Sequence, residues 1–413
     1  MEPVVHSVDA DKLEFGGGLE TLLDAALESV APGRLLEVRT PSRGVALELP
    51  GWARLSGHEV VEERHSFDIW EVIIRRGASR RVLAGPLPPR SESPRLRGGE
   101  FHTGDWRAAT PAEIADPGAG FAPLGSVVEE CATPYHWALG TRDALWADDV
   151  AELAEQASAQ QWDASAEVPW SEAVGLPGEI ERAVAQVMTF IAQNEYAALY
   201  IPARFLPNVN PQYPELLLWL SSHVHDEARH IEVFTKRALA GGYVGYAMAS
   251  TELSLRTLME EQNFTSSSFL LNVLGEGTFL DLLRFIELNA PDAATAAACK
   301  LAHRDERRHV HFGISHVRRV VEQDQSAKGE LMAAAQARAA KLSSLSGISP
   351  MLLEALTILA AGSMGRTAIG SAASRVNEMT QLMERNRIRR LVACGFDDET
   401  ARELSDMHTP NLM

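Results

Sequence analysis

The sequence predicts a multi-domain protein, in which a small N-terminal α/β domain precedes an all-α helix bundle with extra C-terminal helices. The chain has 413 residues, 46% of them hydrophobic and 23% charged, which is an ordinary globular composition with room for two to three domains. Strand-like and helix-like runs alternate before about residue 85, whereas apolar residues beyond Leu145 recur with helical period. We therefore expect domains at 1–85, 141–325 and 326–413, with a connector at 86–140.

The N-terminal 85 residues carry the signals of a two-layer unit of order βαβαββ. Residues 35–39 and 70–74 are rich in Leu, Val and Ile and predict strands, and residues 19–30 predict a helix. Pro32-Gly33 and Pro50-Gly51 predict turns between these elements. The connector that follows is rich in Pro and Gly, so we expect it to be largely irregular.

This N-terminal unit resembles the TusA-type sulfur-carrier family over residues 6–77. The resemblance rests on Pro32-Gly33, on the strand at 35–39, on Leu49-Pro50-Gly51-Trp52 and on the closing Arg75-Arg76-Gly77. In that family a Cys-Pro-x-Pro at the start of the first helix carries sulfur as a persulfide. This chain has Gly18-Leu19-Glu20-Thr21 there and no cysteine before Cys131, so we expect a degenerate domain kept for packing or partner docking.

The helical half contains one pattern twice, Asp226-Glu227-Ala228-Arg229-His230 and Asp305-Glu306-Arg307-Arg308-His309. Each repeat holds a Glu-x-x-His, whose two side chains lie on one helix face and can reach the same metal ion. Glu195 precedes the first repeat's glutamate by 32 residues, and Glu276 precedes the second's by 30, which suits a helix, a turn and a return helix. Four helices that supply Glu, Glu-x-x-His, Glu and Glu-x-x-His form the ligand set of ferritin-like di-metal carboxylate proteins.

These acids lie inside the apolar stripes of their helices rather than opposite them. Glu227 and His230 follow Leu216, Leu220 and Val224 on one face, and the other three glutamates are placed in the same way. An unpaired buried carboxylate costs several kcal/mol, so four facing one core need cations. The predicted ligands of two divalent metal ions are Glu195, Glu227, His230, Glu276, Glu306 and His309.

The aspartates of the repeat are predicted to support the histidines. A metal-bound imidazole usually donates its other N–H to a carboxylate, so we expect Asp226 and Asp305 each to face the histidine of the opposite repeat. The alternative is that both are solvated acids on the helix surface. Arg229 and Arg308 are expected to pair with these aspartates. His223, one turn before Glu227, is interpreted as a hydrogen-bonded core histidine or as a second such supporting residue.

Residues 140–325 resemble the ribonucleotide-reductase-like branch of the ferritin-like superfamily, and the doubled Asp-Glu-x-Arg-His is similar to hydroxylase subunits of bacterial multicomponent monooxygenases. The resemblance implies a carboxylate-bridged di-iron centre that uses O2 to oxidise an organic substrate, with an Mn/Fe pair as the alternative. The radical-bearing tyrosine of the reductase subunit would fall at Phe234, which favours an oxygenase or oxidase. Phe190, Phe234 and Phe279 either border a substrate pocket or fill the core.

The amino-acid composition limits the kinds of partner and cofactor that the protein can have. Lys and Arg number 38 and Asp and Glu 56, and the resulting net charge of −18 argues against a protein that tracks a nucleic-acid backbone. The three cysteines are far apart, which excludes a disulfide framework and a cysteine-bound cluster and fits a reduced cytoplasm. No segment reads as membrane-spanning.

The chain carries no nucleotide-binding motif, so electrons must come from a separate reductase, a ferredoxin or the substrate. We expect a small-molecule substrate and a homodimer. The sequence does not choose among hydroxylation of a carbon, N-oxygenation of an amine, desaturation and C–C cleavage. The alternatives to this enzyme are a ferritin-like storage or peroxide-detoxifying protein and an idle scaffold.

Overall fold

The computed structural model describes residues 4–77, 97–106, 111–124, 126, 134–173, 175–343 and 348–408. Much of the predicted connector, with Cys131, lies outside the described residues. The chain divides into two units, Met1–Ser93 with Gly118–Tyr135 and Pro94–Pro117 with His136–Met413.

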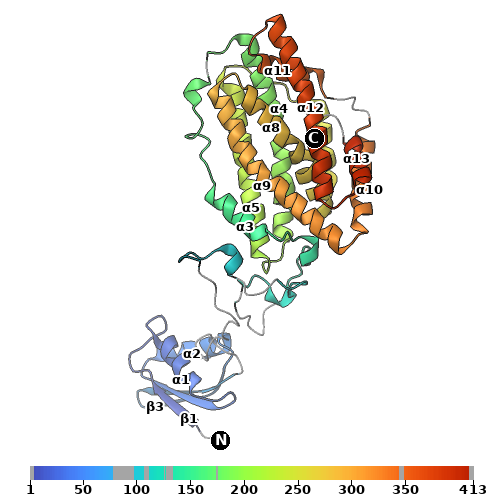
Figure 1. Ribbon diagram of the computed structural model, residues 1–413. Helices are drawn as coiled ribbons and strands as arrows, with labels where there is room; N and C mark the ends of the chain where they lie inside the picture. Colours follow the sequence, from blue (N-terminus) through green and yellow to red (C-terminus); the bar gives the residue numbers. More distant parts are fainter. Residues whose placement is uncertain are drawn as a thin grey trace. The chain divides into compact units, whose positions relative to one another are not determined.

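The N-terminal unit is a four-stranded sheet with two helices. Its elements are β1 (Val4–Asp9), α1 (Leu19–Glu28), β2 (Leu35–Thr40), α2 (Arg43–Leu55), β3 (Glu59–Ser66) and β4 (Ile69–Arg75). The strand order is β1-β2-β4-β3, with β1 parallel to β2 and the other two pairs antiparallel. Both helices pack on one face of the sheet, because Leu23 of α1 and Leu49 of α2 share a core with Val38 and Val72. The predicted βαβαββ order is confirmed (Figure 1).

The turn predicted at Pro50-Gly51 is wrong, because both residues lie inside α2. Pro50 cannot donate a backbone hydrogen bond there, which weakens the helix locally. The apolar face formed by Val45, Leu49 and Ala53 is fully buried and outweighs that loss, and Ser42 Oγ caps the helix by accepting from the Val45 N–H. The other predicted turn holds, since Gly33 has a φ of +83° between α1 and β2.

The C-terminal unit is built almost entirely of helices. Short 3-10 turns, η1 (Thr103–Asp105), η3 (Arg142–Ala144), η4 (Trp170–Glu172) and η5 (Leu206–Asn208), punctuate its connections, and η2 (Pro117–Ala119) lies at the boundary of the two units. Its helices are α3 (Val150–Ala159), α4 (Gly178–Phe205), α5 (Pro214–Ala240), α6 (Ala249–Glu260), α7 (Phe264–Ser268), α8 (Gly277–Asn289), α9 (Ala293–Gln323), α10 (Ala327–Lys341), α11 (Pro350–Ala361), α12 (Arg366–Ala393) and α13 (Asp398–Met407).

Four of these helices, α4, α5, α8 and α9, lie side by side and form the bundle (Figure 1). α4 packs on α5, α8 packs on α9, and α5 joins the two pairs by packing on α9. The buried residues of α10 to α13, such as Leu331, Leu356, Met379 and Leu404, belong to the same hydrophobic core as the bundle.

The third bundle helix begins differently from the expectation. The predicted continuous helix over 265–290 is α7, then a π-helix, η6 (Phe269–Glu276), and then α8. A π-helix winds one extra residue into a turn, and such segments occur frequently at functional sites. Glu276 is the last residue of this segment, so the irregular winding determines where its carboxylate points.

Within the described residues, no single helix is both long and apolar enough to cross a membrane. The pair α11 and α12, bent by 118° at their junction, passes that test together by length and composition alone.

Candidate metal centre

Seven buried acidic and imidazole side chains meet inside the bundle. α4 supplies Glu195, α5 supplies His223, Glu227 and His230, η6 supplies Glu276, and α9 supplies Glu306 and His309. None of them is more than 4% exposed. The structure therefore places together the six residues that were singled out from the sequence, and it adds His223.

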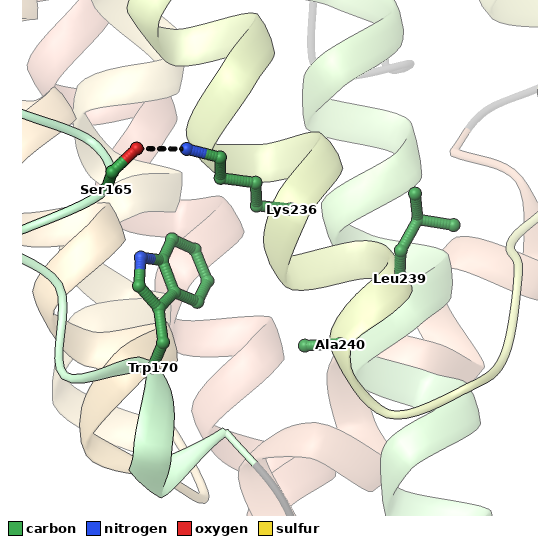
Figure 2. A pocket seen from close by; sticks show the side chains of 5 residues that line it. All are labelled: Ser165, Trp170, Lys236, Leu239 and Ala240. Carbon is green, nitrogen blue, oxygen red and sulfur yellow. Dashed lines mark hydrogen bonds between the residues drawn. The ribbon is translucent and has the colours of Figure 1, made fainter.

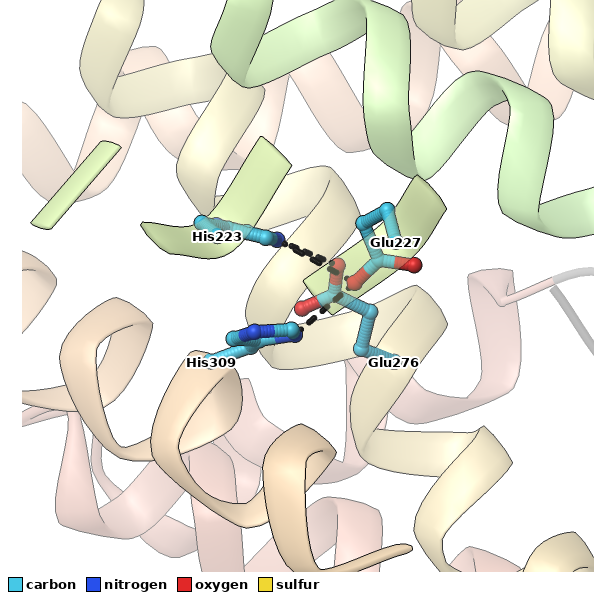
Figure 3. Close-up of side chains that lie close together, drawn as sticks. All are labelled: His223, Glu227, Glu276 and His309. Atoms are coloured by element: carbon cyan, nitrogen blue, oxygen red, sulfur yellow. Dashed lines mark hydrogen bonds and ion pairs between the residues drawn. The ribbon is translucent and has the colours of Figure 1, made fainter. Parts of the chain in front are cut away.

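These side chains form two groups that share one carboxylate. In the first group, Glu195, Glu227, His230 and Glu306 each offer a donor atom within 4.8 Å of the others. In the second group, His223, Glu227, Glu276 and His309 do the same (Figure 3). Two adjacent cation positions joined by Glu227 follow from this geometry.

Glu227 and Glu306 each face both repeat histidines. Glu227 Oε2 lies 3.3 Å from His230 Nδ1, and its Oε1 lies 2.9 Å from His309 Nδ1. Glu306 Oε1 and Oε2 lie 3.4 Å from the same two nitrogens, respectively. Both carboxylates can therefore bridge two ions, one oxygen to each. Glu195 and Glu276 then stand at opposite ends of the centre.

The sequence reasoning missed His223 as a member of the centre. Its Nε2 lies 3.3 Å from Glu276 Oε1 and 3.5 Å from Glu227 Oε1, and its ring stacks on His309 with centroids 3.8 Å apart. It falls on the same apolar stripe as Glu227, four residues earlier, which is the signal that could have identified it.

The two histidines of the repeat are oriented by aspartates from the opposite repeat. Asp305 Oδ2 lies 3.4 Å from His230 Nε2, and Asp226 Oδ2 lies 3.4 Å from His309 Nε2. Both aspartates are fully buried, which excludes the alternative of solvated surface acids. With Nε2–H donating to a carboxylate, Nδ1 of each ring presents its lone pair to the bridging glutamates.

The guanidiniums of Arg229 and Arg308 connect the two aspartates. Arg229 Nη2 donates to Asp226 Oδ1 and, over 3.1 Å, to Asp305 Oδ2. Arg308 Nη2 donates to Asp305 Oδ1 over 2.7 Å and to Asp226 Oδ2 over 3.0 Å. Trp162, which the sequence reasoning did not single out, adds an indole N–H to Asp305 Oδ2 at 2.6 Å.

Unpaired polar atoms converge on the two cation positions. Among the described residues, seven buried atoms here take part in no hydrogen bond: Glu195 Oε1, both oxygens of Glu227 and of Glu306, and Nδ1 of His230 and of His309. Buried polar atoms are rarely left unpaired in proteins, and a lone pair facing another lone pair is repulsive. Divalent cations would satisfy all seven atoms, so the residues present fit a pair of metal ions.

The formal charges agree with this reading. Four glutamates and two aspartates in the centre carry six negative charges, and the two arginines return two positive charges, which leaves four negative charges buried. Two divalent cations balance that charge.

Without cations, the pKa values of several groups in the centre shift toward protonation, whereas the neighbouring histidines hold the pKa of Glu227 well below its ordinary value despite burial. Burial raises the pKa of Glu195 well above its ordinary value, and the carboxylates of Glu227 and Glu306 raise it further. Burial also raises the pKa of Glu276. The pKa of His230 is raised well above its ordinary value, because the Glu227 carboxylate and the contact with Asp305 outweigh burial. Protons thus take the place of cations at the same groups.

The phenylalanines proposed as pocket residues are buried near the centre. Phe190 stacks on Phe279 with centroids 5.9 Å apart, and the Phe234 ring lies 6.3 Å from that of His230. A cavity of about 460 Å³ lies farther along α5 and is lined by Ser165, Trp170, Lys236, Leu239 and Ala240 (Figure 2). Another, of about 340 Å³, lies between α4 and the loop after α5. Neither of these two cavities is lined by those phenylalanines.

Parts of the chain are similar to a sulfur carrier and to oxidases of known structure. No family model matches the chain. A protein of Archaeoglobus fulgidus named as a sulfur carrier is 30% identical over 50 residues, which are 12% of this chain and 68% of that protein. An R2-like ligand-binding oxidase variant with an anaerobically reconstituted Mn/Fe cofactor is 16% identical, with a TM-score of 0.42, over 57% of this chain and 92% of that chain. The same oxidase with an aerobically reconstituted metal cofactor after photoconversion is 16% identical, with a TM-score of 0.39, over 62% and 88%.

The sulfur-carrier similarity falls on the N-terminal unit, whose sheet has the predicted topology. At the position of the family's sulfur-carrying cysteine this chain has Gly18, whose φ of +105° few other residues adopt. The helical unit has a four-helix core, and glutamates and histidines that could bind metal ions point into it. The N-terminal unit of this chain therefore belongs to the sulfur-carrier family, and the core of its large helical unit is a four-helix bundle with the ligand pattern of ferritin-like proteins.

Proposed function

We propose that the protein is a non-haem di-iron oxidoreductase that activates O2 to oxidise or oxygenate a small organic substrate. The observation that carries the proposal is the pair of donor groups sharing Glu227, with seven unpaired atoms directed at two adjacent positions. Carboxylate oxygens and imidazole nitrogens in this proportion suit iron or manganese. Ferrous iron bound by these residues would supply the electrons that reduce O2.

The residues around the two positions would have different roles. Glu227 and Glu306 would bridge the ions, Glu195 would hold the first ion together with His230, and Glu276 would hold the second together with His223 and His309. The aspartate–arginine network keeps both Nδ1 atoms directed inward. The apolar wall that includes Phe190 and Phe234 excludes water from the centre.

The two positions differ in donor chemistry. With Glu227 and Glu306 shared, each position has three carboxylates, but the first has one imidazole and the second has two. Oxygen-rich sites suit manganese better, and imidazole suits iron. We assign an Fe/Fe pair. The alternative is an Mn/Fe pair, in which the difference between the donor sets would place manganese in the first group.

An oxidase or oxygenase is favoured over a radical-storing protein because Phe234, one turn after His230, has no hydroxyl to oxidise. Electrons for repeated turnover would come from a separate reductase or ferredoxin. The acidic surface implied by the net charge of −18 suits docking of such a partner through a basic patch.

Anaerobic reconstitution with ferrous iron tests the proposal. We expect two irons per chain, a Mössbauer spectrum of two high-spin ferrous sites, and optical changes on adding O2 that candidate substrates accelerate. Large iron loads per chain would instead support storage. Absence of bound iron would support a scaffold and contradict the proposal.

A further inference from the structure

A segment outside the four ligand-bearing helices contacts the network behind the histidines. α3 ends at Ala159, and the next two residues, Gln160 and Gln161, each accept a hydrogen bond from one guanidinium. Arg308 Nη1 donates to Gln160 Oε1 over 2.9 Å, and Arg229 Nη1 donates to Gln161 Oε1. Each arginine therefore has one amino group on a glutamine and the other on the aspartates.

This double attachment fixes both guanidiniums. A guanidinium is a rigid planar fork of donors, so bonds through both Nη1 and Nη2 restrict its orientation more than bonds through Nη2 alone. Asp226 and Asp305 are in turn held by both arginines. The orientation of each metal-facing imidazole thus depends on a chain of contacts that ends at a glutamine.

We propose that Gln160 and Gln161 are positioning residues that, through the two arginines and two aspartates, hold Nδ1 of His309 and His230 toward the bridging carboxylates. This inference rests on the proposed function and names residues that act on the centre without touching a metal. It makes the end of α3 a part of the centre.

The two glutamines differ in the hydrogen bonds that their side chains make, so the same substitution should have different effects at the two positions. The described contacts of the Gln160 side chain use Oε1 alone, as an acceptor. Gln161 also donates through Nε2, to Asp226 Oδ1 at 3.3 Å and to Ala157 O at 2.7 Å. Glutamate retains the acceptor at either position. At 161, however, it loses the donor and places a second carboxylate against Asp226.

Both glutamine side chains are exposed on their outer side, so substitutions there should leave the fold intact. Suitable variants of the full chain are Gln160→Met, Gln160→Glu, Gln161→Met and Gln161→Glu. Gln156→Met, at an exposed glutamine on the preceding helix α3, is the matched control. Thermal melting of each variant checks folding before any other measurement.

The first measurement uses crystals of the metal-free protein. We expect the Arg308 guanidinium to be displaced or disordered in Gln160→Met, and the Arg229 guanidinium in Gln161→Met and Gln161→Glu, with the facing aspartates following. Gln160→Glu and Gln156→Met should match the wild type. Unchanged arginines and aspartates in both methionine variants would overturn the inference.

The second measurement uses the cobalt(II)-loaded protein and records proton NMR of the imidazole N–H signals shifted by the metal. We expect exchange of these protons with water to be about tenfold faster in Gln160→Met, Gln161→Met and Gln161→Glu, because their acceptor is less well held. Equal behaviour of the two glutamate variants would contradict the inference. Failure of the wild type to bind cobalt would contradict the proposed function, and the metal-free crystals would still decide the positioning role.

Discussion

His309 Nδ1 lies 2.9 Å from Glu227 Oε1, although the two residues belong to different repeats, on α9 and α5. The contact joins the two halves of the centre at the one carboxylate that both donor groups share. A carboxylate so placed serves both ions, whereas Glu195 belongs to the first group alone. Substitutions at these two glutamates should therefore differ in kind.

Glu227→Gln should weaken both bound ions, and Glu195→Gln should weaken one. Loss of a shared charged ligand is expected to lower both affinities at least about 100-fold, because even residues behind the ligands are worth 10-fold to 100-fold. Stepwise anaerobic titration with cobalt(II), followed optically, measures the two affinities. Two intact binding steps in Glu227→Gln would contradict the assignment of this residue as a bridge.

His223→Leu should weaken the ion held by the second group and spare the ion held by the first. Its imidazole contacts Glu276 and Glu227 but is no member of the first group. His225→Leu is the control, because that residue is exposed on the same helix. The same titration is predicted to show one normal step and one weakened step of about tenfold or more. Equal behaviour of the two variants would leave His223 as a core residue.

Metal binding should release protons and strengthen as the pH rises. Burial raises the pKa of Glu195 and Glu276, and acidic neighbours raise the pKa of His230 and His309 despite burial, so each of these groups binds protons more readily in the metal-free protein. Cations bind the deprotonated forms, so at lower pH protons compete more strongly with the metal ions for these groups. Calorimetry at pH 7 in buffers of different ionisation enthalpy counts the protons. A buffer-independent heat would contradict this prediction.

Gly313→Ala should disturb the second group through the π-helix. A Cβ at Gly313 would lie 2.5 Å from Asn272 Cβ and 3.3 Å from Val273 Cγ2. Asn272 Nδ2 donates to Glu276 Oε2 over 2.6 Å, so a shift of η6 moves that carboxylate. We expect a loss of about 1–3 kcal/mol in the free energy of unfolding and weaker binding of one ion.

Gly370→Ala is the control for that substitution, because it lies inside α12 with no atom within 4 Å of the added Cβ. It should raise the free energy of unfolding by about 0.5–1 kcal/mol. Chemical denaturation of both variants supplies the comparison. A Gly313→Ala variant as stable and as well loaded as Gly370→Ala would show that η6 tolerates movement.

The sequence predicted the fold class and the set of acids that meet in the core, because both follow from periodicity. A carboxylate inside an apolar stripe is visible without coordinates, and the spacing of Glu195 and Glu276 from the two repeats is nearly equal. His223 was interpreted as a hydrogen-bonded core histidine or a supporting residue, and its burial and its contact with Glu276 agree with that interpretation, but its place in the second donor group was not predicted. Its stacking on His309 comes from another helix and leaves no local signal.

Other features could not be predicted from the sequence, because they depend on contacts between distant segments. Gln160, Gln161 and Trp162 lie outside any repeat and reach the centre only after α3 has packed on α5 and α9. The mostly apolar segment at 269–276 reads the same for an α-helix and a π-helix. Pro50 signals a turn locally, and burial of the α2 face overrides that signal.

The most direct test of the central claim is anomalous diffraction from crystals of the iron-loaded full chain, measured at the iron edge. The account predicts two peaks inside the bundle, one among Glu195, Glu227, His230 and Glu306 and the other among His223, Glu227, Glu276 and His309. Peaks confined to the surface, or an empty core with these seven side chains arranged as they are here, would contradict it.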